Sequence, residues 1–238
     1  MPVKDLHFWD EFEASGAKVE QIALFDHNAI DPQQRDTLLN SGAKVTHILD
    51  HHADQNLYDT QVEMKQVRFI GSACSLLTFL LRDNEAKFSQ DLGSDGVNLA
   101  YLLSAPVLLD SSNFHPDLKG NKWSDEDIDA FKWLQSKCQL PSSFYADLLA
   151  VKADQKVALS LTLRQNILRD YKNFQIGKGL LGAAVFVFPP AAAIETYPDF
   201  VSQVDAFCTE NKLSIFCSLS NVESPEGFEK HLLVFKPN

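Results

Sequence analysis

Two short apolar segments of this chain each end in an acidic residue, and a helical segment separates them. The first reads Gln-Ile-Ala-Leu-Phe-Asp over residues 21–26, and the second reads Val-Thr-His-Ile-Leu-Asp over residues 45–50. Between them, Asp31 and Pro32 have the residue types of an N-cap and a first helical position, and Gly42 suits the helix end. A strand, a helix and a second strand in this order predict a right-handed crossover between parallel strands. We therefore expect an α/β fold built on a parallel sheet.

The second strand leads directly into three polar residues, Asp50, His51 and His52. Parallel strands bring their carboxyl ends to one edge of the sheet, so Asp26 is expected to lie close to these residues. Adjacent histidines on an extended segment point to opposite sides, and only one of them easily faces a given metal ion. A polar loop with a hydrogen-bonded histidine is the alternative interpretation of the pair taken alone.

A third apolar segment, residues 97–109, ends at Asp110. Its composition predicts a buried helix with a break or kink at Pro106. A lone aspartate at such a position is usually a cap or turn residue, but with Asp26 and His51 it completes a set of carboxylate and imidazole ligands. This set suits Mn²⁺, Co²⁺ or Mg²⁺ better than a structural zinc ion. A divalent ion in an open site of this kind activates water for hydrolysis.

Residues 66–70 have the composition of a third strand. A run of small residues, Gly-Ser-Ala-Cys-Ser over 71–75, then leads into a helix over residues 76–82. Small residues before a helix N-terminus allow an anion to approach it closely. A routine strand-to-helix turn is equally compatible with this spacing.

A domain boundary is expected near residue 150, after two further helices at residues 124–137 and 141–153. We therefore expect one domain over residues 1–150 and a smaller one over residues 151–238. Hairpin-like spacing in the second domain predicts a mixed sheet. Its expected elements are helices at residues 161–169 and 199–211 and strands at residues 171–174, 182–188, 213–219 and 231–235.

The composition narrows the class of partner. Of the 238 residues, 45 % are hydrophobic, which is enough to bury a substantial core. A formal net charge of -11 argues against binding to a nucleic-acid backbone. The four cysteines form no Cys-x-x-Cys pair, so we expect them to be reduced and buried. No apolar run approaches the roughly 18 residues of a membrane span, and no signal peptide is evident, so a cytoplasmic location without membrane association is expected.

Four segments in this order and spacing resemble the DHH phosphoesterase superfamily. They are Leu-Phe-Asp-His-Asn over residues 24–28, Leu-Asp-His-His over 49–52, Gly-Ser-Ala-Cys-Ser over 71–75, and Leu-Leu-Asp-Ser-Ser-Asn-Phe over 108–114. Within the superfamily, the chain looks most like the eukaryotic exopolyphosphatase and prune branch, which is related to the family II inorganic pyrophosphatases. The segments at residues 167–174 and 177–179 are similar to the opening of that branch's C-terminal substrate-binding domain.

The resemblance implies a particular set of metal ligands and substrate contacts. Asp26 would bridge two metal ions, with His51 and Asp110 completing one of the two sites. Asp50 would orient a ligand or be a ligand itself. His52 would face the scissile oxygen, where an imidazolium stabilises or protonates the leaving phosphate.

A phosphate-binding lysine is implied in the second half of the chain. Lys172 would bind a substrate phosphate from the C-terminal domain, giving a cleft that closes on the polyanion.

Two motifs of the family have no counterpart in this chain. The first is a strand that ends in His or Asn and two aspartates, upstream of the position of Asp26, and it supplies much of one metal site. The second is a basic Arg-Lys segment beyond Lys236, which grips terminal phosphates. We therefore expect an N-terminally truncated parallel-sheet DHH domain followed by the smaller mixed-sheet domain. The truncation leaves an open sheet edge, which predicts self-association.

The expected function is an exopolyphosphatase-type hydrolase of phosphoanhydride bonds. Such an enzyme releases terminal phosphate from inorganic polyphosphate by attack of metal-activated hydroxide, using Mn²⁺ or Mg²⁺. An inorganic pyrophosphatase or a nucleotide phosphodiesterase is the alternative within the same chemistry. A catalytically impaired binding or interaction module is the alternative from a different class, because part of the ligand set is missing.

Overall fold

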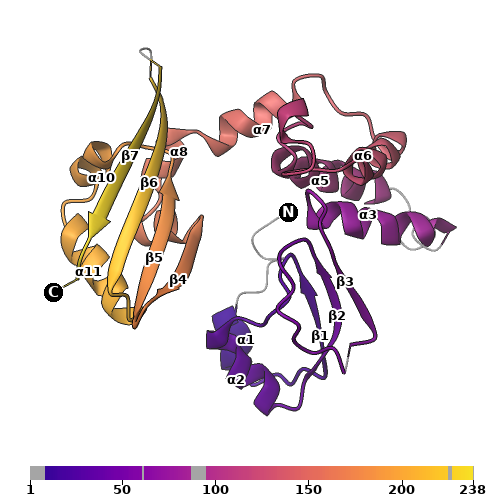
Figure 1. The fold of residues 1–238 in the computed structure, drawn as a ribbon, viewed down its shortest axis with the longest axis horizontal. Coiled ribbons are helices and arrows are strands. Elements are labelled where there is room, and N and C mark those ends of the chain that lie inside the picture. The colour runs from indigo at the N-terminus through magenta and orange to yellow at the C-terminus, as the bar shows by residue number, and fades with distance from the viewer. Residues whose placement is uncertain (1–8, 61, 87–94, 225–226, 238) are drawn as a thin grey trace. The chain divides into compact units, whose positions relative to one another are not determined.

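The computed structural model describes residues 9–60, 62–86, 95–224 and 227–237 (Figure 1). The chain divides into two compact units, Met1–Leu148 and Leu149–Asn238. Each unit contains its own sheet, three-stranded in the first and four-stranded in the second.

The first unit combines a parallel sheet with a group of helices. Its strands are β1 (Gln21–Phe25), β2 (Lys44–Asp50) and β3 (Met64–Val67). Its helices are α1 (Trp9–Ser15), α2 (Pro32–Asn40), α3 (Ala73–Asp83), α5 (Asp95–Asp110), α6 (Asp125–Lys137) and most of α7 (Phe144–Lys152), with a short 3-10 helix η2 (Pro116–Leu118). The predicted parallel sheet is confirmed, with strand order β1-β2-β3 and both pairings parallel.

Helices cover both faces of this parallel sheet. Val45 and Ile48 of β2 pack with Leu38 of α2 on one face, where one irregular step in the β1–β2 pairing brings both strand residues to the same side. Leu49 points to the other face and joins the cluster that contains Leu76 of α3. β1 is an edge strand of the described sheet, and the predicted self-association through an edge remains a prediction.

Helices α3, α5 and α6 form a second core in the first unit. Cys74, Val107 and Leu134 are among its buried residues. Helix α5 continues through Pro106 without a break, so of the two predicted alternatives only the kink stays a prediction. Proline lacks the N–H that would bond the carbonyl of Leu102, but Leu102 is exposed, so water can bond that carbonyl instead.

The second unit is a mixed sheet with helices packed on it. Its strands are β4 (Tyr171–Ile176), β5 (Gly179–Phe186), β6 (Ile215–Ser224) and β7 (Gly227–Phe235). Its helices are α8 (Gln155–Ser160), α9 (Leu163–Leu168), α10 (Pro190–Thr196) and α11 (Phe200–Glu210). The predicted mixed sheet is confirmed, because β5 and β6 are parallel while the other two pairings are antiparallel.

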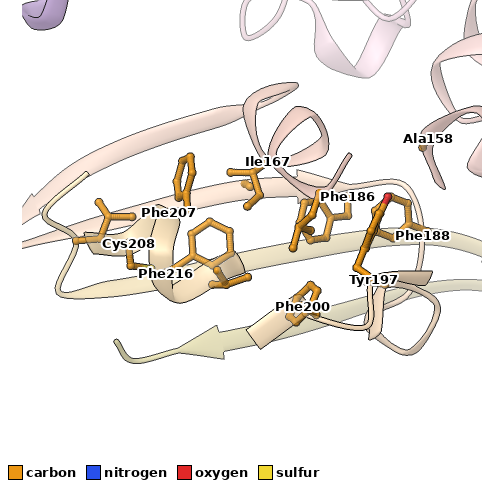
Figure 2. Close-up of a cluster of buried hydrophobic side chains, with 14 residues drawn as sticks. Ala158, Ile167, Phe186, Phe188, Tyr197, Phe200, Phe207, Cys208 and Phe216 are labelled. Carbon is orange, nitrogen blue, oxygen red and sulfur yellow. The ribbon is translucent and has the colours of Figure 1, made fainter. Parts of the chain in front are cut away.

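Aromatic side chains dominate the core of the second unit (Figure 2). Phe186 and Phe188 stack with ring centroids 5.0 Å apart, and Phe207 of α11 meets Phe216 of β6 edge to face. Asn166 is buried beside them and donates to the carbonyl of Ala158 and to the Tyr197 hydroxyl. Polar and apolar contacts together fix α8, α9 and α10 onto one face of the sheet.

Replacing Phe216 with alanine should destabilise the second unit by about 3–5 kcal/mol, because its side chain is fully buried and leaves a cavity. Phe174→Ala is the matched control, since Phe174 lies in the same sheet and is 51 % exposed. It should change the free energy of unfolding by no more than about 0.5 kcal/mol. Amide hydrogen exchange in β5 and β6 measures the unfolding of this unit alone. Equal effects of the two substitutions would contradict the described core.

Among the described helices, none combines the length and the apolar character needed to cross a membrane.

Candidate functional site

Asp26 stands at the carboxyl end of β1, next to the end of β2. Its backbone N–H donates to the carbonyl of Leu49 at 2.9 Å, which extends the β1–β2 pairing by one residue. Its φ angle is +66°, a left-handed conformation that is uncommon for residues other than glycine. Such strain is concentrated at functional sites in proteins. The turn directs the Asp26 carboxylate, which is largely exposed, back toward the end of β2.

His51 joins Asp26 at this edge. Its Nε2 lies 3.2 Å from Asp26 Oδ1, and its Nδ1 lies 3.1 Å from the carbonyl oxygen of Ile70. A carbonyl oxygen only accepts hydrogen bonds, so Nδ1 carries the proton, and in the neutral ring Nε2 keeps a lone pair. A lone pair facing a carboxylate oxygen is stable when a cation or a proton lies between the two atoms. The donor set therefore fits a divalent metal ion.

His52 completes a group that is suited to hold a metal. One ligand atom from each of Asp26, His51 and His52 lies within 4.8 Å of the others. The two imidazole rings meet edge to face, with centroids 4.5 Å apart. His52 is the more accessible histidine, with 55 % of its side chain exposed.

Asp50 is fully buried beneath this group, and its carboxylate fixes the backbone of the two histidines. Its Oδ1 accepts from the N–H groups of His51 and His52, at 2.8 and 3.2 Å, and from His52 Nδ1 at 2.8 Å. Its Oδ2 accepts from the side-chain amide of Asn28. Burial alone would raise the pKa of Asp50, but the hydrogen bonds from His52 and Asn28 together hold that pKa below its ordinary value. Asp50 is therefore an anion, and its carboxylate orients the His52 ring.

Asp110 lies at the end of α5 and outside the group of three. Its Oδ2 accepts from the Ser72 hydroxyl at 2.6 Å, and Ser72 is also the N-cap of α3. Burial raises the pKa of the Cys74 thiol to about 12, and the charges of Asp110 and Asp26 contribute to this shift. Both carboxylates thus act on one buried thiol. The assignment of Asp110 as a metal ligand remains a prediction.

Lys172 belongs to the second unit. It lies on β4 and is exposed to solvent. Its contact with substrate phosphate remains a prediction.

The site also contains polar residues that had no assigned role from the sequence. Asn28 is buried and connects the two strand ends, because its amide donates to Asp50 and to the carbonyl of Ala53 and its oxygen accepts from the N–H of Gln55. Asn28 directly follows Asp26 and His27 at the end of β1, and this position in the sequence is the feature from which its role could have been predicted. Ser72 lies in the Gly-Ser-Ala-Cys-Ser segment over residues 71–75. Its hydrogen bond to Asp110 joins residues 38 positions apart, and no local sequence pattern indicates such a bond.

Neither a family model nor a curated protein matches the chain. A crystal structure from Methanococcus jannaschii, provisionally assigned as a family II inorganic pyrophosphatase, is similar in fold, with a TM-score of 0.64 and 20 % sequence identity. The match covers 91 % of this chain and 69 % of that chain. At this level of identity, the likeness shows the fold alone. The chain therefore has the fold of that structure, with the parallel sheet of the first unit followed by the mixed sheet of the second.

Proposed function

We propose that the chain is a metal-dependent hydrolase of phosphoanhydride bonds, which releases terminal phosphate from inorganic polyphosphate. The observation that carries this proposal is the pairing of His51 Nε2 with Asp26 Oδ1 at the carboxyl edge of a parallel sheet. The order of the four sequence motifs, which resemble those of exopolyphosphatases, supports the choice of substrate. Pyrophosphate is the second candidate substrate, and the fold similarity to the M. jannaschii structure favours it.

Asp26 and His51 would hold a Mn²⁺ or Mg²⁺ ion, with Asp110 as a further ligand. The ion would supply Lewis acidity, which acidifies water and screens phosphoryl charge. The backbone turn at Asp26 and the carbonyl of Ile70 fix the two main ligands before the ion arrives. Such preorganisation reduces the cost of ordering the site on binding.

His52 is proposed to hold the proton that the leaving phosphate requires. Its Nδ1 is bonded to Asp50, which leaves Nε2 as the ring atom available to substrate. The hydrogen bond to the anionic Asp50 keeps the ring in one orientation. Lys172 is proposed to bind a substrate phosphate by its positive charge.

The test measures phosphate release from long-chain polyphosphate, pyrophosphate and a cyclic nucleotide, each with Mn²⁺, with Mg²⁺ and with a chelator. We expect release from polyphosphate that the chelator removes and that added Mn²⁺ restores. Release should fall by about 100-fold or more in His52→Ala, in line with the usual contribution of a general acid. Undiminished release in the chelator would overturn the metal-dependent mechanism.

Calorimetric titration with Mn²⁺ separates the enzyme from a binding module. Tight binding together with turnover supports the hydrolase. Weak binding of one ion without turnover of any of the three substrates would instead indicate a non-catalytic module.

A further inference from the structure

The first turn of α6 contains three consecutive acidic residues in different environments. Asp125 pairs with Lys119 at 2.6 Å and Glu126 pairs with Arg68, and both acids are exposed. Asp127 is fully buried. Burying a carboxylate is costly unless its oxygens accept hydrogen bonds. The hydrogen-bond partners of Asp127 therefore show which segments of the chain this side chain holds together.

The Asp127 carboxylate accepts four hydrogen bonds from uncharged donors. Its Oδ2 accepts from the N–H of Gly71 at 2.9 Å and from the N–H and hydroxyl of Ser124 at 2.8 and 3.2 Å. Its Oδ1 accepts from the Ser75 hydroxyl at 2.7 Å. Asp127 therefore ties the N-terminus of α6 to the turn at residues 71–75, whose last three residues begin α3, more than 50 positions earlier in the chain.

Two groups at this turn contact the candidate site directly. The carbonyl of Ile70, which precedes Gly71, accepts from His51 Nδ1, and the hydroxyl of Ser72 donates to Asp110. The turn thus sets the orientation of one imidazole and one carboxylate.

The turn has little freedom to move toward α6. A Cβ atom on Gly71 would lie 2.6 Å from the carbonyl oxygen of Lys122 and 3.1 Å from Asp127 Oδ2. Only glycine fits at this approach without a shift of the backbone.

We propose that Asp127 is a positioning residue for the metal centre. By holding the turn at residues 71–75, it places the Ile70 carbonyl against His51 and the Ser72 hydroxyl against Asp110. Its role at a metal centre rests on the proposed function. Hydrogen-bonded partners behind metal ligands commonly contribute about 10–100-fold to metal affinity.

The main comparison is between Asp127→Ala and Asp127→Asn, with Asp125→Asn as the matched control. The asparagine oxygen can accept from the N–H groups of Gly71 and Ser124, while its amide can donate to the Ser75 hydroxyl. Asp125→Asn removes the same charge from the same helical turn. By calorimetry, Mn²⁺ affinity should fall by about 10–100-fold in Asp127→Ala and stay near the wild-type value in the other two variants.

A second readout uses the metal-free protein. Long-range ¹H–¹⁵N NMR spectra, recorded where imidazole is neutral, report which nitrogen of His51 carries the proton. We expect Nδ1 protonation in the wild type, Asp127→Asn and Asp125→Asn, and loss of this preference in Asp127→Ala. If the wild type does not bind Mn²⁺, the proposed function fails, while the NMR comparison still decides the role of Asp127.

Folded Asp127→Ala with wild-type Mn²⁺ affinity and an unchanged His51 proton would overturn the proposal. If Asp127→Ala does not fold, Gly71→Ala decides, because it keeps the carboxylate and displaces the turn. The same loss of affinity and of the Nδ1 preference is expected in Gly71→Ala. Wild-type values for both measurements in Gly71→Ala would likewise overturn it.

Discussion

Asp26→Asn is expected to lower the affinity for Mn²⁺ by more than about 100-fold, because loss of a partner behind a ligand already costs about 10–100-fold. Phosphate release should fall to the level seen in chelator. Asparagine tolerates the left-handed backbone of Asp26 and has nearly the same volume, so the turn after β1 should survive the substitution. The loss would therefore report the missing charge rather than a rebuilt backbone.

Thermal unfolding gives an independent measurement of the same effect. At a free Mn²⁺ concentration of 100 times Kd, binding should stabilise the wild-type protein by about 2.7 kcal/mol, and Asp26→Asn should show almost none of this stabilisation. Asp36→Asn is the control, since Asp36 is an exposed acid of the same unit that pairs with Arg35. Stabilisation by Mn²⁺ that persists in Asp26→Asn would exclude Asp26 as a ligand.

The parallel sheet of the first unit was predictable because several local signals agree. Apolar runs of strand length, a proline at the first helical position and a glycine after the helix all indicate the same crossover, and β1, α2 and β2 follow it closely. Adjacent strand ends then follow from the topology. For this reason Asp26 and His51 could be brought together from the sequence alone.

Elements that depend on tertiary packing were predicted less well. β3 ends at Val67, three residues before the expected end, because the chain beyond it leaves the sheet and turns toward α3. Helix α10 was not predicted, since its alanine run has no amphipathic pattern, although Ala193 is fully buried in the core. In both cases, packing against other parts of the chain determines the local structure.

The hydrogen bonds that support the site could not be predicted from the sequence either. The sequence does not distinguish Asp127 from Asp125 and Glu126. All three are acidic residues in the first turn of a helix, where a negative charge is favourable. Only the fold shows that one of them is buried against Gly71 and Ser75. Hydrogen bonds between residues far apart in sequence leave no local periodicity.

Asp50 links the stability of the first unit to pH. Its pKa lies below the ordinary value of 3.8, so its contribution to stability is present above about that pH and is lost as the pH falls through the folded-state pKa. This contribution is lost when the carboxylate is replaced.

Asp50→Asn should lower the rate of phosphate release by about 10²–10⁴-fold while the protein remains folded. The substitution removes the negative charge beside His52, and the amide of the new side chain meets the Asn28 amide as a second donor. One unsatisfied buried donor costs about 1–3 kcal/mol, which urea unfolding should detect. Asp50→Ala leaves all of these donors unpaired and should cost more.

Asp54→Asn separates the orienting role of Asp50 from a general loss of charge. Asp54 follows the same polar segment but pairs with Lys65 at 2.8 Å. Its substitution should leave the rate of phosphate release within a few-fold of wild type, because its partners are Lys65 and the N–H of Asn56 and not His52. The Mn²⁺ affinity of Asp50→Asn should fall far less than that of Asp26→Asn, because Asp50 contacts His52 and the backbone rather than the Asp26 carboxylate. An Asp50→Asn protein with the wild-type rate would show that the imidazole of His52 needs no anion behind it, and the proposed proton transfer from His52 would then be wrong.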